Sequence, residues 1–179
     1  MIYADNAATT KISDLAFEKM VPFLREQYGN ASSQYSLGVK ARYAIEQARE
    51  QAARGIYAEA AEILFTSGGS EANSWVLRAI SEMFRCKNIH IITSSIEHHS
   101  VLNACHALKS MGTEVTYLPV NSIGTVEIGS VKTAIKPNTK LVSIMLANNE
   151  IGTIQPIAEI GKYLHERGIL FHTDAVQAV

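Results

Sequence analysis

The stretch LFTSGGSEAN, residues 64–73, decides how this chain folds. An apolar run ends there in two glycines, Gly68 and Gly69, and a helix-like sequence begins at once. Because glycine takes backbone angles that other side chains forbid, the pair predicts a tight turn. Ser70 suits the N-cap of the following helix, and Glu71 places a negative charge where it matches the helix dipole.

This turn between a strand and a helix has two interpretations. Unpaired backbone N–H groups at a helix N-terminus form a favourable place for a phosphate group. The same residues also suit a well-capped turn that binds no ligand. The local spacing favours neither interpretation, so the rest of the chain decides between them.

The composition is that of an ordinary globular protein. Of the 179 residues 47% are hydrophobic and 18% are charged, and the formal net charge is -1. No basic cluster occurs, so we expect no nucleic-acid partner. The longest apolar runs are strand-sized, so we expect no membrane span. Cys86 and Cys105 are isolated and no signal peptide is evident, which predicts a reducing, cytoplasmic location.

Residues 1–30 are expected to form an N-terminal extended segment followed by a helix. Ser13 suits the N-cap of that helix, and Pro22 predicts a kink or two short helices in place of one. Residues 36–54 carry one apolar stripe at helical spacing, and Gly55 is the expected end of that second helix.

From residue 63 onward, short apolar runs alternate with amphipathic segments. Strands are expected at residues 63–66, 89–93, 115–118, 141–146 and 169–172, and helices at residues 70–84, 98–111, 128–135 and 157–167. Continuous apolar strands separated by helices predict a three-layer α/β fold, a mostly parallel sheet with helices on both faces. We assign this domain to residues 31–179.

Polar residues follow several of these expected strands directly. In open parallel sheets, ligands bind beyond the carboxyl ends of the strands. The polar residues at these ends include Gly69 and Ser70, His98, Asn149, Asp174 and Gln177. Apolar strands do not need such groups for stability, so their grouping predicts a small-molecule site.

Each of these residues also has a structural interpretation. His98 can start a helix, Asn149 can occupy a turn, and Asp174 can be an N-cap. The histidines do not recur at metal-ligand spacing, so we expect no metal site. Cys86 and Cys105 have no neighbouring base and are expected to pack in the interior. Only the grouping of the polar residues at one edge favours a ligand.

Five motifs occur in a recognisable order. They are DNAATT at residues 5–10, FTSGGSEAN at 65–73, SIEH at 95–98, NNEIG at 148–152 and HTDAVQ at 172–177. Together they closely resemble the cysteine desulfurases, pyridoxal-phosphate enzymes of the class-V aminotransferase family. The resemblance implies the large domain of a fold-type-I enzyme, incomplete at its C-terminal end. A selenocysteine lyase or another class-V member is the alternative.

The resemblance also implies a reaction and a set of cofactor contacts. In the family, sulfur is taken from L-cysteine, alanine is left, and the sulfur is held as an enzyme persulfide. Gly69 and Ser70 would hold the cofactor phosphate, and His98 would stack on the pyridine ring and help to move protons. Asp174 would pair with the pyridine nitrogen and keep it protonated, which strengthens the ring as an electron sink.

Further contacts are implied at the substrate end of the site. Gln177 would donate a hydrogen bond to the phenolic oxygen of the cofactor, and Asn149 would lie between that oxygen and the substrate carboxylate. Ala8 and Thr9 would approach the substrate. The family is dimeric and works in sulfur transfer such as iron–sulfur cluster assembly, which implies a homodimer and a sulfur-acceptor protein as partners.

The sequence departs from the family pattern in several places. Ala31 stands where the family usually has proline, and Tyr35 stands where it has histidine. No lysine here matches the family's Schiff-base lysine, and neither cysteine matches the persulfide cysteine. We therefore expect the isolated chain to bind pyridoxal phosphate non-covalently at most and to be inactive. A non-catalytic, truncated half-site protein is the alternative of another class; a nucleotide-binding module is disfavoured because Gly-x-Gly-x-x-Gly is missing.

Overall fold

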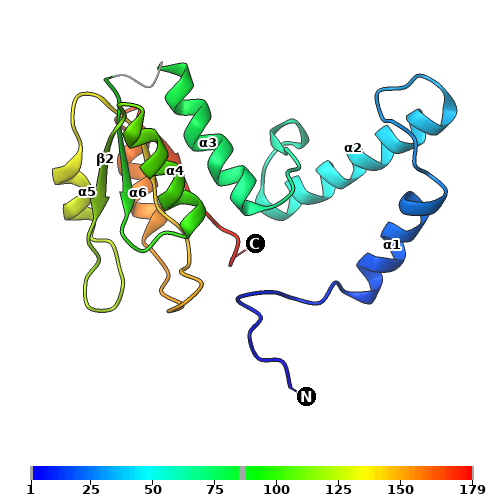
Figure 1. Cartoon of the computed structure of the whole chain (residues 1–179), viewed down its shortest axis with the longest axis horizontal. Helices are drawn as coiled ribbons and strands as arrows, with labels where there is room; N and C mark the ends of the chain where they lie inside the picture. The colour runs from blue at the N-terminus through cyan, green and yellow to red at the C-terminus, as the bar shows by residue number, and fades with distance from the viewer. Residues whose placement is uncertain (1, 85–87, 179) are drawn as a thin grey trace. The chain divides into compact units, whose positions relative to one another are not determined.

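The computed structural model describes residues 2–84 and 88–178 (Figure 1). The chain divides into two compact units, residues 1–65 and residues 66–179. The boundary predicted from the sequence lies after residue 30 instead, and that division into domains stays a prediction. Cys86, which was expected to pack in the interior, lies outside the described residues.

The first unit consists of helices joined by irregular backbone. They are α1 Asp14–Arg25, α2 Ser36–Ile56 and the short 3-10 helix η1 Ala60–Glu62. The predicted cap of α1 is confirmed, because Ser13 Oγ accepts the Ala16 N–H at 3.2 Å. Pro22 lies inside one continuous helix, so the expected pair of short helices is wrong. The backbone continues past the proline, and the N–H groups of Glu26 and Gln27 both donate to the Pro22 carbonyl at 2.8 Å.

The end of α2 also differs from the sequence prediction. The helix continues past Gly55 to Ile56, and Tyr57 takes the left-handed conformation at φ 56°. The Tyr57 N–H donates to the Ala53 carbonyl and so satisfies one of the last carbonyls of the helix. A tyrosine therefore occupies the position where glycine is most common.

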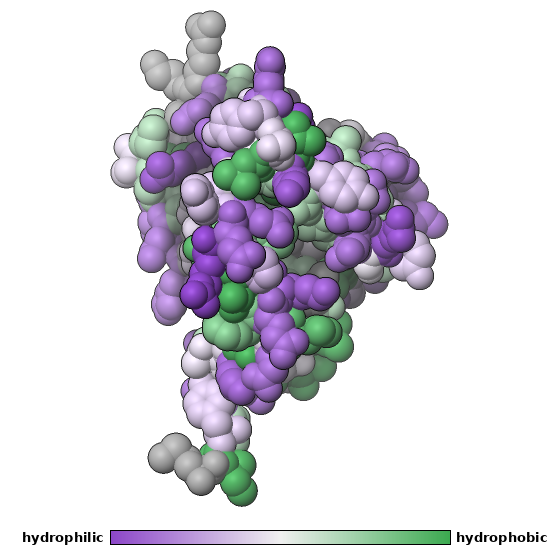
Figure 2. Space-filling view, turned by 90° about the vertical axis from the view of Figure 1, so that its right-hand side faces the viewer, coloured by the Kyte–Doolittle hydropathy of each residue, from purple (hydrophilic) through white to green (hydrophobic). Residues whose placement is uncertain are grey.

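Most apolar side chains of the first unit are exposed. Within its described residues, only Gly38, Ala41 and Ala53 are buried. Figure 2 shows apolar residues among hydrophilic ones on the face that it presents. The large exposed apolar side chains of α1 are Leu15, Phe17, Met20, Phe23 and Leu24. The first unit by itself therefore lacks the kind of core that stabilises a domain.

The second unit contains a parallel four-stranded sheet in the order β2-β1-β3-β4. Its strands are β1 His90–Ser94, β2 Glu114–Leu118, β3 Thr139–Ser143 and β4 Leu170–His172. The strand expected at residues 63–66 is wrong. That segment is extended, but no described residue pairs with it, and a strand requires a hydrogen-bonded neighbour.

Helices cover both faces of this sheet. They are α3 Gly69–Met83, α4 His99–Ser110, α5 Ile128–Ala134 and α6 Ile157–His165. Ile91 packs in one core with α3 and α4, and its neighbour Ile92 packs in another core with α5 and α6. This alternation arises because successive side chains of a strand point to opposite faces. Figure 1 shows α3 beside α4. The predicted three-layer α/β fold is confirmed.

The two cores supply the stability of the second unit. Leu77 of α3, Val101 of α4 and Ile160 of α6 are all fully buried. Burial of one such side chain contributes about 1.5–3 kcal/mol. These cores fix the strands, and thereby the loops at the carboxyl ends of the strands. Among the described residues, no helix combines the length and the apolar character that a bilayer crossing requires.

Candidate functional site

The order of the strands creates a crevice between β1 and β3. The helix that follows β1 lies on one face of the sheet, and the helix that follows β3 lies on the other face. The loops after these two neighbouring strands therefore separate, and such a switch point is where open parallel sheets bind ligands. A cavity is found there, lined by Ser95, Ile96, Glu97, His98, His99, Leu102, Asn148, Asn149, Glu150 and Ile151.

Glu97 joins the two sides of this crevice. Its carboxylate accepts the Ser94 hydroxyl at 2.6 Å and the Met145 N–H at 3.0 and 3.1 Å. Burial, and to a smaller extent the charge of Asp174, raises the pKa of Glu97 to about 7 although the hydrogen bonds from Ser94 and Met145 oppose this rise. No role was predicted for Glu97 from the sequence, although a charged residue three positions after an apolar strand is a usable signal.

The two neighbouring asparagines after β3 differ in function. Asn148 is buried and holds the loop: its Nδ2 donates to the Ile96 carbonyl at 2.8 Å, and its Oδ1 accepts the N–H groups of Glu150 and Ile151. Asn149 lines the cavity, and no hydrogen bond within the described part of the chain uses its side chain. The amide that is available to a ligand is therefore that of Asn149.

The N-terminus of α3 forms a second part of the site. Gly68 is the N-cap and α3 begins at Gly69, so the prediction of Ser70 as the N-cap is wrong. The reason is Glu71, whose carboxylate accepts both the N–H and the hydroxyl of Ser67 at 2.6 Å. These hydrogen bonds lower the pKa of Glu71. They stabilise the helix start and leave the Ser70 hydroxyl unused for capping.

Of the two glycines, the structure requires Gly69 for space, and it does not require Gly68. Gly68 has a φ of 160°, an extended angle that other residues also adopt, so the turn does not require glycine's backbone freedom at this position. Gly69 is helical, and a Cβ on it would lie 2.6 Å from Val176 Cγ2. The N-terminus of α3 therefore lies against the segment that follows β4, which contains Asp174 and Gln177.

Asp174 is held in a fixed position after β4. It is buried, its Oδ2 accepts Asn73 Nδ2 at 2.7 Å, and its Oδ1 accepts the Val176 N–H at 3.0 Å. Its carbonyl accepts the Leu146 N–H at 2.8 Å, which continues the contact between β4 and the strand beside it. The sequence analysis did not assign a role to Asn73, which lies 101 positions from its partner.

His98 is the N-cap of α4, as the structural interpretation of this residue suggested. Its Nδ1 accepts the Ser100 N–H at 3.1 Å and lies 2.8 Å from Ser100 Oγ. The cap uses Nδ1, and no described residue forms a hydrogen bond with Nε2; the ring of His99 makes an edge contact with that of His98, with centroids 6.3 Å apart. His98 also lines a cavity together with Ser70 of α3, and it lines the crevice with Asn149. His98 is therefore both a helix cap and a lining residue of both cavities.

The remaining site candidates lie elsewhere or at the end of the chain. Ala8 and Thr9 belong to the first unit, where their N–H groups donate to the Asp5 carbonyl, so their approach to the substrate stays a prediction. Gln177 is exposed in a turn closed by the Ala178 N–H on the Ala175 carbonyl at 2.9 Å. Among the described residues, no three His, Cys, Asp or Glu side chains are arranged to hold a metal ion.

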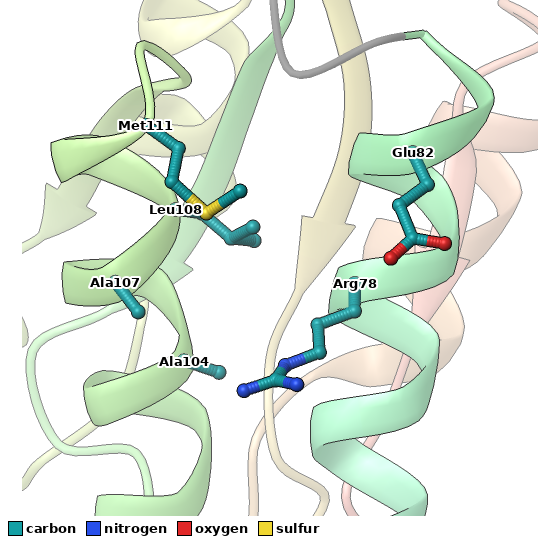
Figure 3. A pocket seen from close by; sticks show the side chains of 6 residues that line it. All are labelled: Arg78, Glu82, Ala104, Ala107, Leu108 and Met111. Carbon is teal, nitrogen blue, oxygen red and sulfur yellow. The ribbon is translucent and has the colours of Figure 1, made fainter.

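A smaller groove lies farther along α3 and α4 (Figure 3). Arg78 extends from α3 across the groove toward Ala104 of α4, and Glu82 lies above it on α3. The α4 side of this groove is apolar, and Arg78 and Glu82 are exposed. It offers no convergent group of acids, bases and donors, so the site is at the carboxyl edge of the sheet.

A helix N-terminus, a buried carboxylate, an imidazole and an amide thus meet at the switch point of a doubly wound parallel sheet. This is the arrangement of a cofactor-binding α/β enzyme domain. The chain belongs to the aminotransferase class-V family, whose sequence profile matches residues 2–179. Enzymes of this family use pyridoxal phosphate.

Curated relatives and solved structures agree with this assignment. The chain is 51% identical over 178 residues to cysteine desulfurase IscS of Methanosarcina thermophila, covering 99% of this chain and 44% of the relative. It is 46% identical over 179 residues to a cysteine desulfurase of a Nostoc species, again covering 44% of the relative. The chain thus spans about half the length of the curated relatives that it matches.

Two solved structures share the fold. A NifS-like protein superposes with a TM-score of 0.94 at 40% identity, covering 98% of this chain and 49% of that protein. SspA, solved in complex with cysteine, superposes with a TM-score of 0.93 at 43% identity, covering 98% of this chain and 51% of that protein. The expected large-domain fold is therefore confirmed, and this chain corresponds to part of it.

Proposed function

We propose that this chain supplies the cofactor-holding part of a pyridoxal-phosphate-dependent cysteine desulfurase, which converts L-cysteine into L-alanine and transfers the sulfur to the enzyme. The observation that carries the proposal is the fixed, buried carboxylate of Asp174 beside the N-terminus of α3. The relatives support it, because the desulfurase match extends over 99% of this chain.

The residues present fit the two ends of the cofactor. Asp174 already accepts two hydrogen bonds, but an ionised carboxylate has about four acceptor sites and so has capacity for a pyridinium N–H. At the other end, no described residue accepts a hydrogen bond from the N–H groups of Gly69 and Ser70. Two such donors at the positive end of a helix suit a phosphate.

In this proposal each side chain has one task. Gly69 and Ser70 bind the phosphate, Asp174 accepts the pyridine N–H, and the ring of His98 covers one face of the pyridine. Pyridoxal phosphate, when bound, supplies an electron sink that stabilises a carbanion on the substrate. By keeping the pyridine nitrogen protonated, Asp174 strengthens that electron sink.

The other residues orient the substrate end. Gln177 donates to the phenolic oxygen of the cofactor, Asn149 lies between that oxygen and the carboxylate of cysteine, and Ala8 and Thr9 approach the substrate. A homodimer, a sulfur-acceptor protein and a cytoplasmic location are further proposals. The homodimer and the acceptor protein rest on the family resemblance alone, and the location rests on the two isolated cysteines of the sequence.

Cofactor binding is the direct test. Titration of the 179-residue chain with pyridoxal phosphate should give a saturable change in cofactor absorbance. Asp174→Ala should weaken binding by about tenfold or more, because a charge-assisted hydrogen bond is lost. The matched control is Asp14→Ala in α1, where the aspartate pairs with Lys11 at the surface. Equal affinity of Asp174→Ala and the unchanged chain would refute the site.

We also propose that the 179-residue chain does not turn over cysteine alone. No lysine among the described residues lines either cavity that contains His98, so none is placed to anchor the cofactor covalently. Incubation with pyridoxal phosphate and cysteine should therefore release neither alanine nor sulfide. Release of several molecules of alanine per chain would contradict this.

A further inference from the structure

A buried amide connects two titratable groups of the proposed site, Asp174 and His98. Asn73 in α3 is only 4% exposed. Its Nδ2 donates to Asp174 Oδ2 at 2.7 Å and to Ser100 Oγ at 2.9 Å. Ser100 Oγ in turn lies 2.8 Å from His98 Nδ1. Three side-chain hydrogen bonds thus run from the end of β4, through α3, to the N-cap of α4.

The chemistry of the partners fixes the direction of these hydrogen bonds. An ionised carboxylate only accepts, so the Asn73 amide must turn its NH₂ group toward Asp174. The second hydrogen of that NH₂ group then points to Ser100 Oγ, which acts as the acceptor. The Ser100 hydroxyl hydrogen is left to donate to His98 Nδ1.

His98 Nδ1 therefore receives two donors. One is the Ser100 hydroxyl at 2.8 Å, and the other is the Ser100 backbone N–H at 3.1 Å. A nitrogen that accepts in this way carries no proton. In the neutral ring the proton must then be on Nε2, because one nitrogen of imidazole donates while the other accepts.

We propose that Asn73 and Ser100 are positioning residues that orient Asp174 and fix His98 as its Nε2–H tautomer. The relevance for catalysis rests on the proposed function, but the tautomer is a property of the chain itself. Neutral His98 thus offers a hydrogen-bond donor at Nε2. It can act as a base at that nitrogen only after it has released the proton.

This arrangement also sets a preference for what His98 contacts. A donor at Nε2 favours an acceptor, such as a carboxylate or phenolic oxygen, over a protonated amine. Since Nδ1 is occupied by the cap, rotation of the ring would break both hydrogen bonds from Ser100. The orientation of His98 and that of Asp174 therefore depend on the same amide of Asn73.

The tautomer can be measured without cofactor. The 179-residue chain, labelled with ¹⁵N-histidine, gives long-range ¹H–¹⁵N correlations that distinguish a protonated from an unprotonated ring nitrogen. The His98 signals are identified by their loss in His98→Gln. At a pH where the ring is neutral, we expect Nδ1 unprotonated and Nε2 protonated. A protonated Nδ1, or an even mixture of tautomers, would overturn the proposal.

Variants test the chain of hydrogen bonds from Asp174 through Asn73 and Ser100 to His98, called the relay below. Asn73→Ala and Ser100→Ala should each raise the Nδ1–H population of His98 by about fivefold, the effect of losing one ordinary hydrogen bond. Ser100→Thr retains a hydroxyl and should restore the original tautomer. The controls are Asn103→Ala, exposed on α4, and Ser110→Ala, whose hydroxyl donates only to the Ala107 carbonyl. Unchanged tautomers in both Asn73→Ala and Ser100→Ala would refute the relay.

The design separates this inference from the proposed function. Circular dichroism and the signals of the other histidines show whether a variant is folded, and only folded variants are compared. If pyridoxal phosphate does not bind although His98 is the Nε2–H tautomer, the proposed function fails and the positioning role stands. If the cofactor binds but Nδ1 is protonated, the positioning role fails and the proposed function stands.

Discussion

The carboxylate of Glu97 accepts the backbone N–H of Met145 with both oxygens, at 3.0 and 3.1 Å. This contact joins the loop after β1 to the residues that follow β3, across the crevice of the proposed site. Because Glu97 is 5% exposed, its charge lies in a poorly solvated place, and protonation there has consequences for folding.

Glu97 should make the stability of the protein depend on pH. Its pKa rises from 4.5 to about 7 in the folded chain, so the unfolded chain loses the proton first as pH increases. Stability from Glu97 is thus complete below pH 4.5 and is lost as pH rises through about 7. Between about pH 4 and about pH 8, the free energy of unfolding of the unchanged chain should fall by about 3 kcal/mol more than that of Glu97→Gln. One pKa unit corresponds to about 1.4 kcal/mol.

Urea unfolding at about pH 4 and about pH 8 measures this difference, since these values bracket both pKa values. Glu159→Gln, an exposed change in α6, serves as the control. Parallel pH dependence of the unchanged chain and Glu97→Gln would show that the carboxyl is not titrating as expected.

Gly69→Ala should destabilise the second unit, whereas Gly68→Ala should not. A Cβ at residue 69 would lie 2.6 Å from Val176 Cγ2, while nothing lies within 4 Å of one at residue 68. Overpacking of this kind costs about 1 kcal/mol or more. Thermal unfolding of the two variants gives the comparison. Adding Val176→Ala to Gly69→Ala should recover the loss; if it does not, the contact with Val176 is not the cause.

The pair Asn148 and Asn149 should separate a structural amide from a site amide. Asn148→Ala removes four hydrogen bonds of a buried side chain and should lower the free energy of unfolding by about 1–3 kcal/mol. Asn149→Ala should change it by less than about 0.5 kcal/mol. Chemical denaturation of both variants tests this, and similar losses for the two would contradict the assignment.

Cys105 should be unreactive in the folded protein. It is fully buried between α4 and the sheet, and burial raises the pKa of its thiol from 9.0 to about 12. This rise lowers the thiolate fraction by roughly a thousandfold at neutral pH. In a Cys86→Ser background, a thiol-specific reagent should label Cys105 only after denaturant is added. Rapid labelling of the native chain would show that this part of the core opens.

The sequence predicts the sheet and its covering helices well, because their signals are local. Apolar runs such as that around Ile91 and amphipathic segments such as α6 are evident without knowledge of the fold. The segment at residues 63–66 has the same signal but no partner strand within the described residues, and pairing is not a local property. Tyr57, which ends α2 in place of Gly55, shows that a suitable residue type does not determine where a helix stops.

The candidate site was predictable in outline only. The carboxyl-end rule grouped His98, Asn149 and Asp174 correctly at one edge of the sheet. It could not predict the contact of Asn73 with Asp174, since the two residues are 101 positions apart. One signal was present: Asn73 is a polar residue one helical turn before the fully buried Leu77 of α3.

Asn73 lies four residues after Gly69, so both groups that face the segment after β4 stand on the same face of α3, one turn apart. The α-helix places them roughly 6 Å apart along its axis and on the same side. The separation between the N–H groups proposed to bind the phosphate and the amide that holds Asp174 is therefore set by helix geometry and not by a loop. One residue inserted within this turn would rotate Asn73 by about 100° away from Asp174, so length changes should be tolerated before Ser67 but not between Gly69 and Asn73.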